Sequence, residues 1–295
     1  MCVTVVLITR DRRQSLLATL AKLRDLPERP PVIVVDNASR DGSADAVAAA
    51  FPEYVLLRSK VNLGAVARNV AVDHVRTPYV AFCDDDTWWE PGALTRAADL
   101  LDAHPRVAVI TGRILVEPGG REDPIVVELR DSPLPRLAGL PGPALGSFLA
   151  GASMLRADAF RAAGGFSPRL WLGGEEELLS ADLLTRGWHI CYAEDVLVHH
   201  QPSRLRDPHL RRRHGIRNTL WTTWLRRSPG TALLRTGRLL GTLPRDRVTG
   251  AALVEAAAGI PWVLRERRTL PRHVEEWLRT LDEPQRRSRA RQYVS

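Results

Sequence analysis

Short β-branched runs alternate with longer amphipathic stretches over the first hundred residues, and this alternation constrains the fold more than any other feature of the chain. The predicted strands are residues 3–8, 32–35, 54–57 and 79–83. The predicted helices between them are residues 15–26, 43–51 and 65–75, in which apolar side chains recur at helical spacing. Alternation of this kind predicts an α/β fold with a mostly parallel sheet flanked by helices.

The pattern continues less regularly after residue 91. We expect helices at residues 92–104, 157–163 and 175–186, and strands at residues 107–111, 147–155 and 192–198. Residues 117–146 are rich in Pro and Gly and are expected to form a loop or lid. The rest of the chain is predicted to be helical and basic. The sequence shows no internal repeat.

Composition excludes several classes of protein. A chain of 295 residues that is 44% hydrophobic can bury a full core. No run approaches the roughly 18 apolar residues that span a bilayer, and the N-terminus lacks the features of a signal peptide. The three cysteines have no metal-type spacing and form no disulfide framework. We therefore expect a protein of the reducing cytoplasm.

Positive charge is concentrated near the C-terminus. Residues 201–295 hold 21 arginines and 8 acidic residues, a formal charge of +13, whereas the first 200 residues carry −5. Such a field favours an anionic partner, which leaves nucleotide phosphates, an anionic membrane surface at the inner face and nucleic acid open. A solvated basic face is the alternative for most of these arginines.

Polar residues follow each predicted strand of the first half. They include Thr9, Arg10, Asp36 and the run Asp84, Asp85 and Asp86. Ligands of open α/β sheets bind at the carboxyl ends of the strands. The three aspartates are crowded behind a buried strand, and a divalent cation such as Mg²⁺ or Mn²⁺ would offset their repulsion and also bind substrate phosphates. An acidic turn that begins the following helix is the alternative.

A second acidic cluster, Glu175, Glu176 and Glu177, opens a predicted helix after two glycines. Acidic residues are favoured in a first helical turn by the helix dipole alone. A catalytic interpretation is also open, because a glutamate held near an apolar wall and a metal site suits a general base that deprotonates a hydroxyl group.

Two further patterns suggest ligand contacts. His199 and His200 end a predicted strand, where a histidine is either a metal ligand or a hydrogen-bonded structural residue. Arg213 and Arg217 are one helical turn apart before Trp221 and Trp224. Arginine forks match phosphate oxygens. Capture of a diphosphate is preferred over nucleic-acid binding because the acidic clusters imply that a metal mediates the phosphate contact.

Read together, these segments resemble the family 2 glycosyltransferases, which have the GT-A fold, over about residues 3–225. Five segments carry the resemblance in order: VVLITRDRRQSLLATL, IVVDNASRDGSADAV, NLGAVARN, FCDDDTWWEPGAL and GEEELLSADLLTRGW. The last keeps the register of the family's G-E-D-x-x-L motif, with Glu176 in place of the aspartate.

The resemblance implies roles for individual residues. The predicted nucleotide contacts are Thr9, Arg10, Asp36, Arg68, Asp84 and Asp85. Asp86 is the predicted metal ligand, with His200 ahead of His199 as an additional one. Glu176 is the candidate base, with Glu175 and Glu177 in contention. Arg213 and Arg217 are expected to neutralise the leaving diphosphate.

These expectations define a domain plan and a function. Residues 1–111 form the nucleotide-sugar-binding half of a GT-A domain, residues 112–202 form the acceptor and catalytic-base half, and residues 203–295 form a basic helical extension that serves membrane contact, acceptor binding or homo-oligomerisation. The expected enzyme is an inverting, metal-dependent glycosyltransferase that moves a sugar from UDP, dTDP or GDP to a hydroxyl-bearing acceptor, with no nucleic-acid partner. A sugar nucleotidyltransferase is the nearer alternative, although ITRDRRQS lacks its glycine-rich phosphate loop. A non-catalytic nucleotide-binding module is the other.

Overall fold

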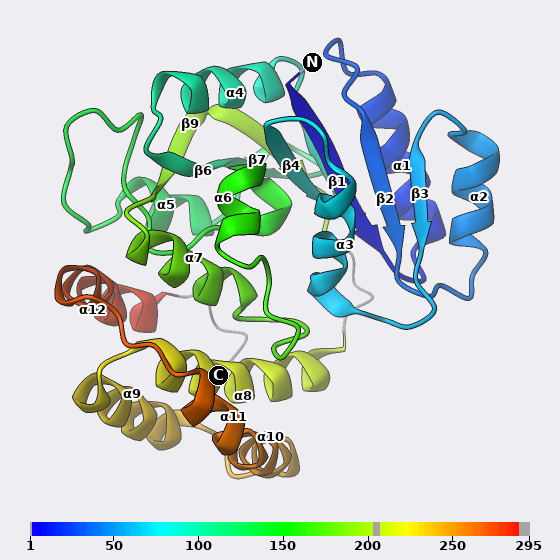
Figure 1. Ribbon diagram of the computed structural model, residues 1–295. Coiled ribbons are helices and arrows are strands. Elements are labelled where there is room, and N and C mark those ends of the chain that lie inside the picture. The colour runs from blue at the N-terminus through cyan, green and yellow to red at the C-terminus, as the bar shows by residue number, and fades with distance from the viewer. Residues whose placement is uncertain (1, 203–206, 289–295) are drawn as a thin grey trace.

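The computed structural model describes residues 2–202 and 207–288. Within these residues, nine strands form one mixed sheet, and eight of them follow the order β3-β2-β1-β4-β8-β6-β9-β5. β7 pairs with β6 beside this path. Helices flank the sheet, and a group of helices from the C-terminal part of the chain lies below it in Figure 1.

The first half of the sheet is parallel, as the alternating sequence predicts. Its strands are β1 (Val3–Thr9), β2 (Val32–Asp36), β3 (Val55–Arg58) and β4 (Tyr79–Asp84). Its helices are α1 (Arg13–Arg24), α2 (Ser43–Ala50) and α3 (Ala67–His74), the last preceded by the 3₁₀ turn η1 (Gly64–Val66). The strand order steps outward from β1 to β3 and then returns to β4, so the order reverses between β1 and β4. Open sheets bind ligands at this switch point.

The second half of the sheet is mixed. It contains β5 (Thr87–Trp89), β6 (Val107–Val116), β7 (Arg121–Glu122), β8 (Ser153–Arg156) and β9 (His189–His200). β8 is antiparallel to both β4 and β6, whereas β9 is parallel to β6 and antiparallel to β5. The helices of this half are α4 (Ala93–Ala103), α5 (Ile125–Arg130), η2 (Ala150–Ala152), α6 (Ala157–Ala162) and α7 (Glu175–Thr185).

One core joins the two halves. It runs through the buried residues of β1, β2, β4, β6, β8 and β9 without a break, and Phe82, Phe160 and Phe166 pack together inside it. The sequence-based boundary near residue 111 falls inside β6, so it does not separate two cores. The predicted halves therefore describe two regions of a single sheet.

The C-terminal region is helical, as expected. It comprises α8 (Pro208–Arg226), α9 (Pro229–Thr242), α10 (Arg247–Ala258), α11 (Ile260–Glu266) and α12 (Arg272–Arg287). α8 packs against α10 through Ile216, Leu220, Ala252 and Ala256. α12 returns to the sheet domain, where Val274, Leu278 and Leu281 join the main core. Residues 203–206 and 289–295 of the predicted extension lie outside the described residues.

Two local predictions were wrong. Residues 117–146 are more than a loop, because β7 and α5 form inside them and bury Ile125, Val126 and Leu129. The short strand β5, which directly follows the aspartate run, was not predicted at all. Its three residues pair with the end of β9, so tertiary pairing creates a strand too short for a sequence pattern to show.

Candidate active site

The ends of three neighbouring strands bring the predicted acidic residues together. In the sheet register, Thr9 of β1 lies beside Asp36 of β2, and Ile8 lies beside Asp84 of β4. Asp85 and Asp86 continue from β4 at the switch point between β1 and β4. The register therefore gathers at one edge the residues that the sequence placed after separate strands.

Asp85 and Asp86 are held by residues of the β1–α1 segment. Thr9 Oγ1 donates to Asp85 Oδ2 at 2.9 Å, and Arg12 Nη1 lies 3.0 Å from both Asp85 Oδ1 and Asp86 Oδ2. Ser15 and Thr19 on α1 donate to the Asp85 carbonyl oxygen at 2.7 and 3.0 Å. Burial raises the pKa of Asp85 to about 6, against the opposing effect of Arg12. The cluster is thus crowded and is only partly neutralised by Arg12.

Asp84 contacts α3 and the η2 turn. It forms an ion pair with Arg68, which is buried on α3. Its backbone N–H donates to Thr87 Oγ1 at 2.8 Å. A β-carbon built on Gly151 would stand 2.7 Å from Asp84 Oδ2, so only a glycine leaves this carboxylate in place. Asp84 is therefore fixed from two sides, by Arg68 and by the η2 turn.

Glu176 approaches the same turn from α7. Its Oε1 accepts a hydrogen bond from the N–H of Ala150 at 3.3 Å, one residue before Gly151. Burial raises the pKa of Glu176, and the charge of Asp84 contributes in the same direction. The structure thus brings Glu176 and the aspartate run together across η2, although 90 residues separate Glu176 from Asp86 in the sequence.

The other two glutamates have different surroundings. Glu175 is 4% exposed, and its Oε2 is buried with no hydrogen-bond partner among the described residues. Burial, reinforced by the charge of Glu176, raises the pKa of Glu175 to about 8. Glu177 turns toward Arg235 of α9, with 3.3 Å between Oε1 and Nη2. Burial therefore favours the protonated form of Glu175, and Glu177 forms part of the contact with the C-terminal helices.

The two histidines at the end of β9 face in different directions. His200 Nε2 lies 3.8 Å from Asp86 Oδ1. His199 stacks on Trp88 and contacts Glu90 and Glu117 through its two ring nitrogens, at 2.5 and 2.9 Å. His200 is the histidine beside the aspartate run, whereas His199 is committed to two carboxylates elsewhere.

The donor set around Asp86 fits a hard divalent cation. A separation of 3.8 Å between Asp86 Oδ1 and His200 Nε2 is shorter than two metal–ligand bonds of about 2.1 Å each. No group of three or more acidic, histidine or cysteine side chains in the described part of the chain is arranged to hold a metal. Mg²⁺ and similar ions are commonly bound by one or two protein ligands and completed by substrate phosphates and water. Asp86 and His200 match that mode.

Asp36 and Arg10 occupy the outer part of the strand-end edge. Asp36 is 4% exposed, its Oδ2 accepts from Ser39 N at 3.1 Å, and its Oδ1 is buried without a hydrogen-bond partner among the described residues. A buried carboxylate oxygen of this kind is costly unless a ligand donates to it. Arg10 is exposed and contacts Asp11 at 3.4 Å, away from the aspartate run.

Arg213 and Arg217 lie in the C-terminal helical region. Both form ion pairs with Glu255 of α10, and Arg217 also donates to the Leu170 carbonyl oxygen at 3.0 Å. Trp221 lies under the Arg217 guanidinium and donates to Ala256. These contacts bind α8 to α10 and to the loop before α7. The structure does not bring either arginine into contact with the carboxylates of the site.

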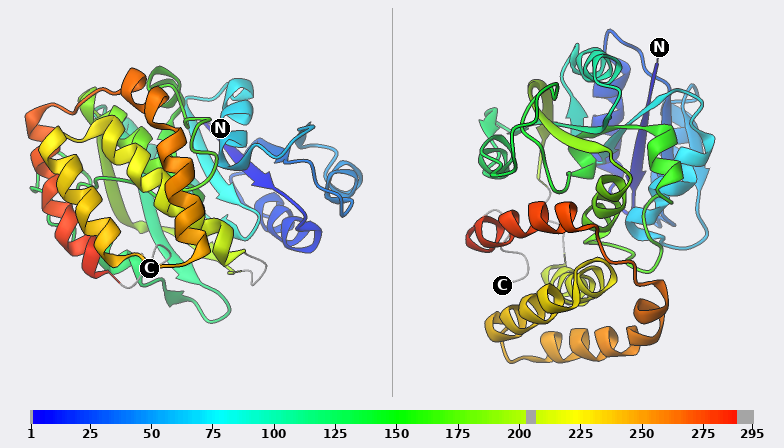
Figure 2. Two further views of the ribbon diagram at one scale, coloured as in Figure 1. Left: turned by 90° about the horizontal axis from the view of Figure 1, so that it is seen from below. Right: turned by 60° about the vertical axis from the view of Figure 1, so that its left-hand side comes forward.

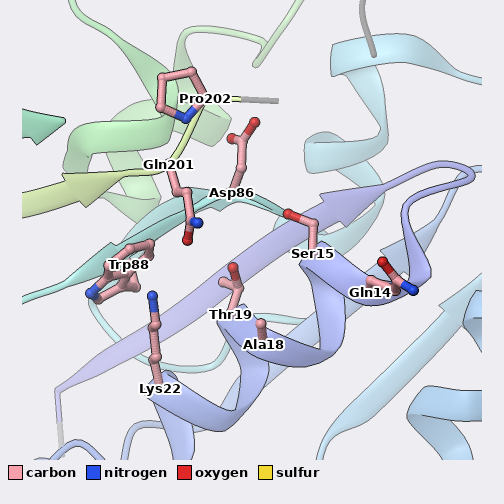
Figure 3. Close-up of a pocket in the computed structure, with 9 residues that line it drawn as sticks. All are labelled: Gln14, Ser15, Ala18, Thr19, Lys22, Asp86, Trp88, Gln201 and Pro202. Carbon is pink, nitrogen blue, oxygen red and sulfur yellow. The ribbon is translucent and has the colours of Figure 1, made fainter. Parts of the chain in front are cut away.

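A pocket of about 320 Å³ opens beside Asp86, between α1, β5 and the end of β9 (Figure 3). Its lining residues are Gln14, Ser15, Ala18, Thr19, Lys22, Asp86, Trp88, Gln201 and Pro202. Lys22 Nζ stands 2.9 Å from the centre of the Trp88 ring. Asp86 thus lines a cavity of mixed polar and apolar character as well as the strand-end edge.

Residues 4–163 match the sequence profile described as "Glycosyl transferase family 2". The chain belongs to this family. It is therefore a glycosyltransferase. The match covers the parallel half of the sheet, the aspartate run and η2, whereas the glutamates of α7 and the histidines of β9 follow the matched region.

Known proteins support this assignment. The N-acetylglucosaminyl-diphospho-decaprenol L-rhamnosyltransferase of Mycobacterium tuberculosis is 27% identical over 248 residues, which cover 71% of this chain and 80% of the relative. The structure resembles mannosyltransferase PcManGT from Pyrobaculum calidifontis in complex with GDP-Man and Mn²⁺, with a TM-score of 0.60, 19% identity, and coverage of 99% of this chain and 83% of that one. It also resembles GalNAc-T7 with UDP, GalNAc and Mn²⁺, with a TM-score of 0.62, 12% identity, and coverage of 90% and 56%. These structural likenesses show that the fold is of the GT-A type.

Sequence reasoning missed three parts of the site of this family 2 glycosyltransferase. Arg12 bridges Asp85 and Asp86. The sequence-based prediction named Arg10 instead, because Arg10 is closer to the end of the strand. Ser15 and Thr19 were read only as helix positions. Gly151 showed no signal in the sequence, since its role depends on a strand neighbour 67 residues away. The basic run after β1 was the one available sign of Arg12.

Proposed function

We propose that this protein is an inverting, metal-dependent glycosyltransferase that moves a sugar from a nucleoside-diphosphate sugar to a hydroxyl-bearing acceptor. One observation carries the proposal. Asp84 and Glu176 meet at the two consecutive residues Ala150 and Gly151, so the predicted donor site and the predicted base share one turn. An inverting single displacement needs the base and the acceptor oxygen on the face of the anomeric carbon opposite the leaving diphosphate, and a shared turn would hold the two parts of the site at a fixed separation.

The nucleotide is proposed to lie along the ends of β2, β1 and β4. The unsatisfied Oδ1 of Asp36 suits the ring N–H of uracil, thymine or guanine. Arg68 holds Asp84 near the ribose, and Asp86 with His200 offers the ligands for Mg²⁺ or Mn²⁺. The bound cation would supply charge neutralisation for the diphosphate. Two of the similar structures contain Mn²⁺, which supports a divalent cation for this chain.

Glu176 is proposed as the general base. Its Oε1 is anchored by the Ala150 N–H, and its raised pKa brings the carboxylate closer to the pKa range in which a base works at neutral pH. Glu175 behind it keeps its proton and so adds no second negative charge. Glu176 would take the proton of the acceptor hydroxyl as the oxygen attacks the anomeric carbon and the bond from that carbon to the diphosphate breaks. Arg12, which contacts Asp86, would help to balance the charge of the departing nucleoside diphosphate.

The acceptor is proposed to be a sugar linked through diphosphate to a polyprenol. The support is the Mycobacterium tuberculosis relative, which is named for such an acceptor and aligns over 71% of this chain. The acceptor half of the domain is covered by the C-terminal helices through α7, where Arg226 forms a two-point contact with Asp182 at 2.7 and 2.8 Å. The sugar donor and the nucleotide base stay open within the three diphosphates named above.

The test is a panel of UDP-, dTDP- and GDP-sugars with Mn²⁺, first without acceptor and then with a short-chain polyprenyl diphosphate sugar. We expect slow release of nucleoside diphosphate with one donor class, and much faster release with the acceptor. The anomeric configuration of the new glycosidic bond is then determined by NMR, and we expect it to be inverted relative to the donor. Formation of nucleoside triphosphate and sugar 1-phosphate when pyrophosphate is added to the donor would reject the proposal in favour of a nucleotidyltransferase, and no turnover with any donor would reject it in favour of a non-catalytic module.

A further inference from the structure

Exposed apolar side chains gather on α9, α10 and α11. The six largest contributors are Leu233, Leu234, Leu240, Val254, Ile260 and Leu264, and they are between 46% and 71% exposed. They represent half of the exposed large hydrophobic residues in the described part of the chain, although these three helices make up only a small part of it. We call this set the α9–α11 surface. Several large apolar side chains exposed on neighbouring helices are typical of an interaction site.

The α9–α11 surface lies away from the sheet. α10 packs on α8 through Ala252 and Ala256, and Leu239, Leu243 and Leu253 fill the space between α9 and α10. α8 lies between these helices and the sheet domain, as Figures 1 and 2 show. The outward side of these helices therefore bears the exposed residues, and it makes no described contact with the sheet domain.

Arginines surround this apolar surface. Arg238, Arg245, Arg247 and Arg268 are exposed and form no ion pair within the described residues. The three acidic residues of the same segment are each paired with arginines: Asp246 with Arg212, Glu255 with Arg213 and Arg217, and Glu266 with Arg169 and Arg265. The unpaired charge at the edge of the surface is thus positive, which complements an anionic partner.

The α10–α11 pair has the composition of a membrane segment without its geometry. No single described helix is long and apolar enough to span a bilayer, but α10 and α11 together meet that criterion with a bend of 50° between them. Ala252 and Val263 are buried against the protein. One side of the pair is therefore occupied by the protein, which suits a segment that lies on a bilayer and not one that crosses it.

We propose that the α9–α11 surface docks the protein on an anionic lipid bilayer. Leu233, Val254 and Leu264 enter the boundary between headgroups and acyl chains, and the exposed arginines contact lipid phosphates. Apolar insertion flanked by cationic side chains is the mode by which amphipathic helices bind membrane interfaces. This inference goes beyond the proposed function and does not depend on it, since vesicle binding needs neither donor nor acceptor.

The test is co-sedimentation of the full chain with vesicles of phosphatidylcholine alone and of phosphatidylcholine with phosphatidylglycerol. We expect binding to the anionic vesicles that weakens as salt is added. Leu264→Glu combined with Val254→Glu should lower the partition coefficient about tenfold or more. Arg245→Gln combined with Arg247→Gln should lower it by roughly fivefold for each arginine removed.

Val127→Glu is the matched control. Val127 is 51% exposed on α5, far along the chain from α9–α11, so a glutamate there should leave vesicle binding unchanged. Circular dichroism checks that each variant is folded, which is expected because all the altered side chains are exposed. The proposal is overturned if the wild type ignores anionic vesicles, or if the Leu264→Glu and Val254→Glu pair binds as well as the control. It is also overturned if light scattering shows a dimer that this same pair abolishes, since the surface would then bind a second copy.

Discussion

Gly151 and Asp84 are in such close contact that a β-carbon on the glycine would stand 2.7 Å from Asp84 Oδ2. Gly151 belongs to the η2 turn, which also offers the Ala150 N–H to Glu176. The turn therefore sets the position of one carboxylate by its lack of a side chain and of another by a backbone hydrogen bond. The separation of Asp84 and Glu176 therefore depends in part on a residue that has no side chain.

Replacing Gly151 should disturb Asp84 more than the fold. In Gly151→Ala the methyl group must push Asp84 from its place beside Arg68, and we expect kcat/KM to fall by roughly tenfold to a hundredfold. Steady-state kinetics with the preferred nucleotide sugar measure the change. Gly230→Ala is the control, because a β-carbon there meets nothing within 4 Å. Unaltered kinetics in Gly151→Ala would show that Asp84 has no fixed role.

Arg12 should stabilise the protein by pairing with Asp85 and Asp86. Arg12→Ala leaves two buried carboxylates facing each other, and we expect the free energy of unfolding to fall by about 2–3 kcal/mol in the absence of metal. Added Mn²⁺ should restore part of the loss. Urea denaturation with and without Mn²⁺ measures both effects. Arg10→Ala, whose side chain is exposed, should change stability by no more than about 0.5 kcal/mol. An equal loss in the two variants would argue against a specific role for Arg12.

Substitutions of Glu176 and of Glu177 should have different effects on turnover. Glu176→Gln keeps the hydrogen bond from Ala150 but cannot take a proton, so we expect kcat to fall about 10²- to 10⁴-fold with little change in donor binding. Glu177→Gln is the control, since Glu177 faces Arg235. Turnover and equilibrium binding of the nucleoside diphosphate are measured side by side. Normal turnover by Glu176→Gln would transfer the assignment of the base to another residue.

Glu175 should make stability depend on pH. Its pKa rises from 4.5 to about 8 on folding, so between these values the unfolded chain has lost the proton that the folded protein retains. Stability therefore decreases as pH rises from about 4.5 to 8. Glu175→Gln removes this dependence and should raise the free energy of unfolding at pH 8.5, relative to its effect at pH 5, by on the order of 1–3 kcal/mol. Denaturant unfolding at the two pH values measures it, and parallel pH profiles for both proteins would contradict the assignment.

His200 and His199 should respond differently to metal. His200→Ala removes the imidazole beside Asp86, and we expect the Mn²⁺ concentration that gives half-maximal activity to rise about 10- to 100-fold. His199→Ala loses the stacking on Trp88 and the contacts with Glu90 and Glu117, which should lower stability with little effect on the Mn²⁺ requirement. Metal titrations of activity on both variants decide between them. A larger metal effect in His199→Ala would reverse the two roles.

The parallel half of the fold was predictable because its strands and helices carry their own periodic patterns. β1, β2 and β4 were placed to within about a residue, and the resemblance of the acidic motifs to family 2 glycosyltransferases is confirmed by the family match. The nucleotide, metal and diphosphate roles assigned to individual residues stay predictions.

What the sequence did not show depends on pairing between distant segments. β5 forms only because it pairs with β9. α5 lies in a stretch of the sequence that has no clear hydrophobic period, so its buried side could not be identified from the sequence. Arg12 and Gly151 matter through neighbours about 70 residues away. Local patterns do not encode such contacts, so even a correct motif list leaves the supporting residues of a site unidentified.

The contacts of Arg12 with Asp85 and Asp86 also have a consequence for the enzyme without a bound cation. Because the guanidinium already lies against Asp85 and Asp86, part of the charge that a cation would balance is balanced by the chain. A chelator should then silence the enzyme without unfolding it, and activity should return on adding metal. If the enzyme needs a cation as proposed, the metal-free protein should therefore be folded and inactive.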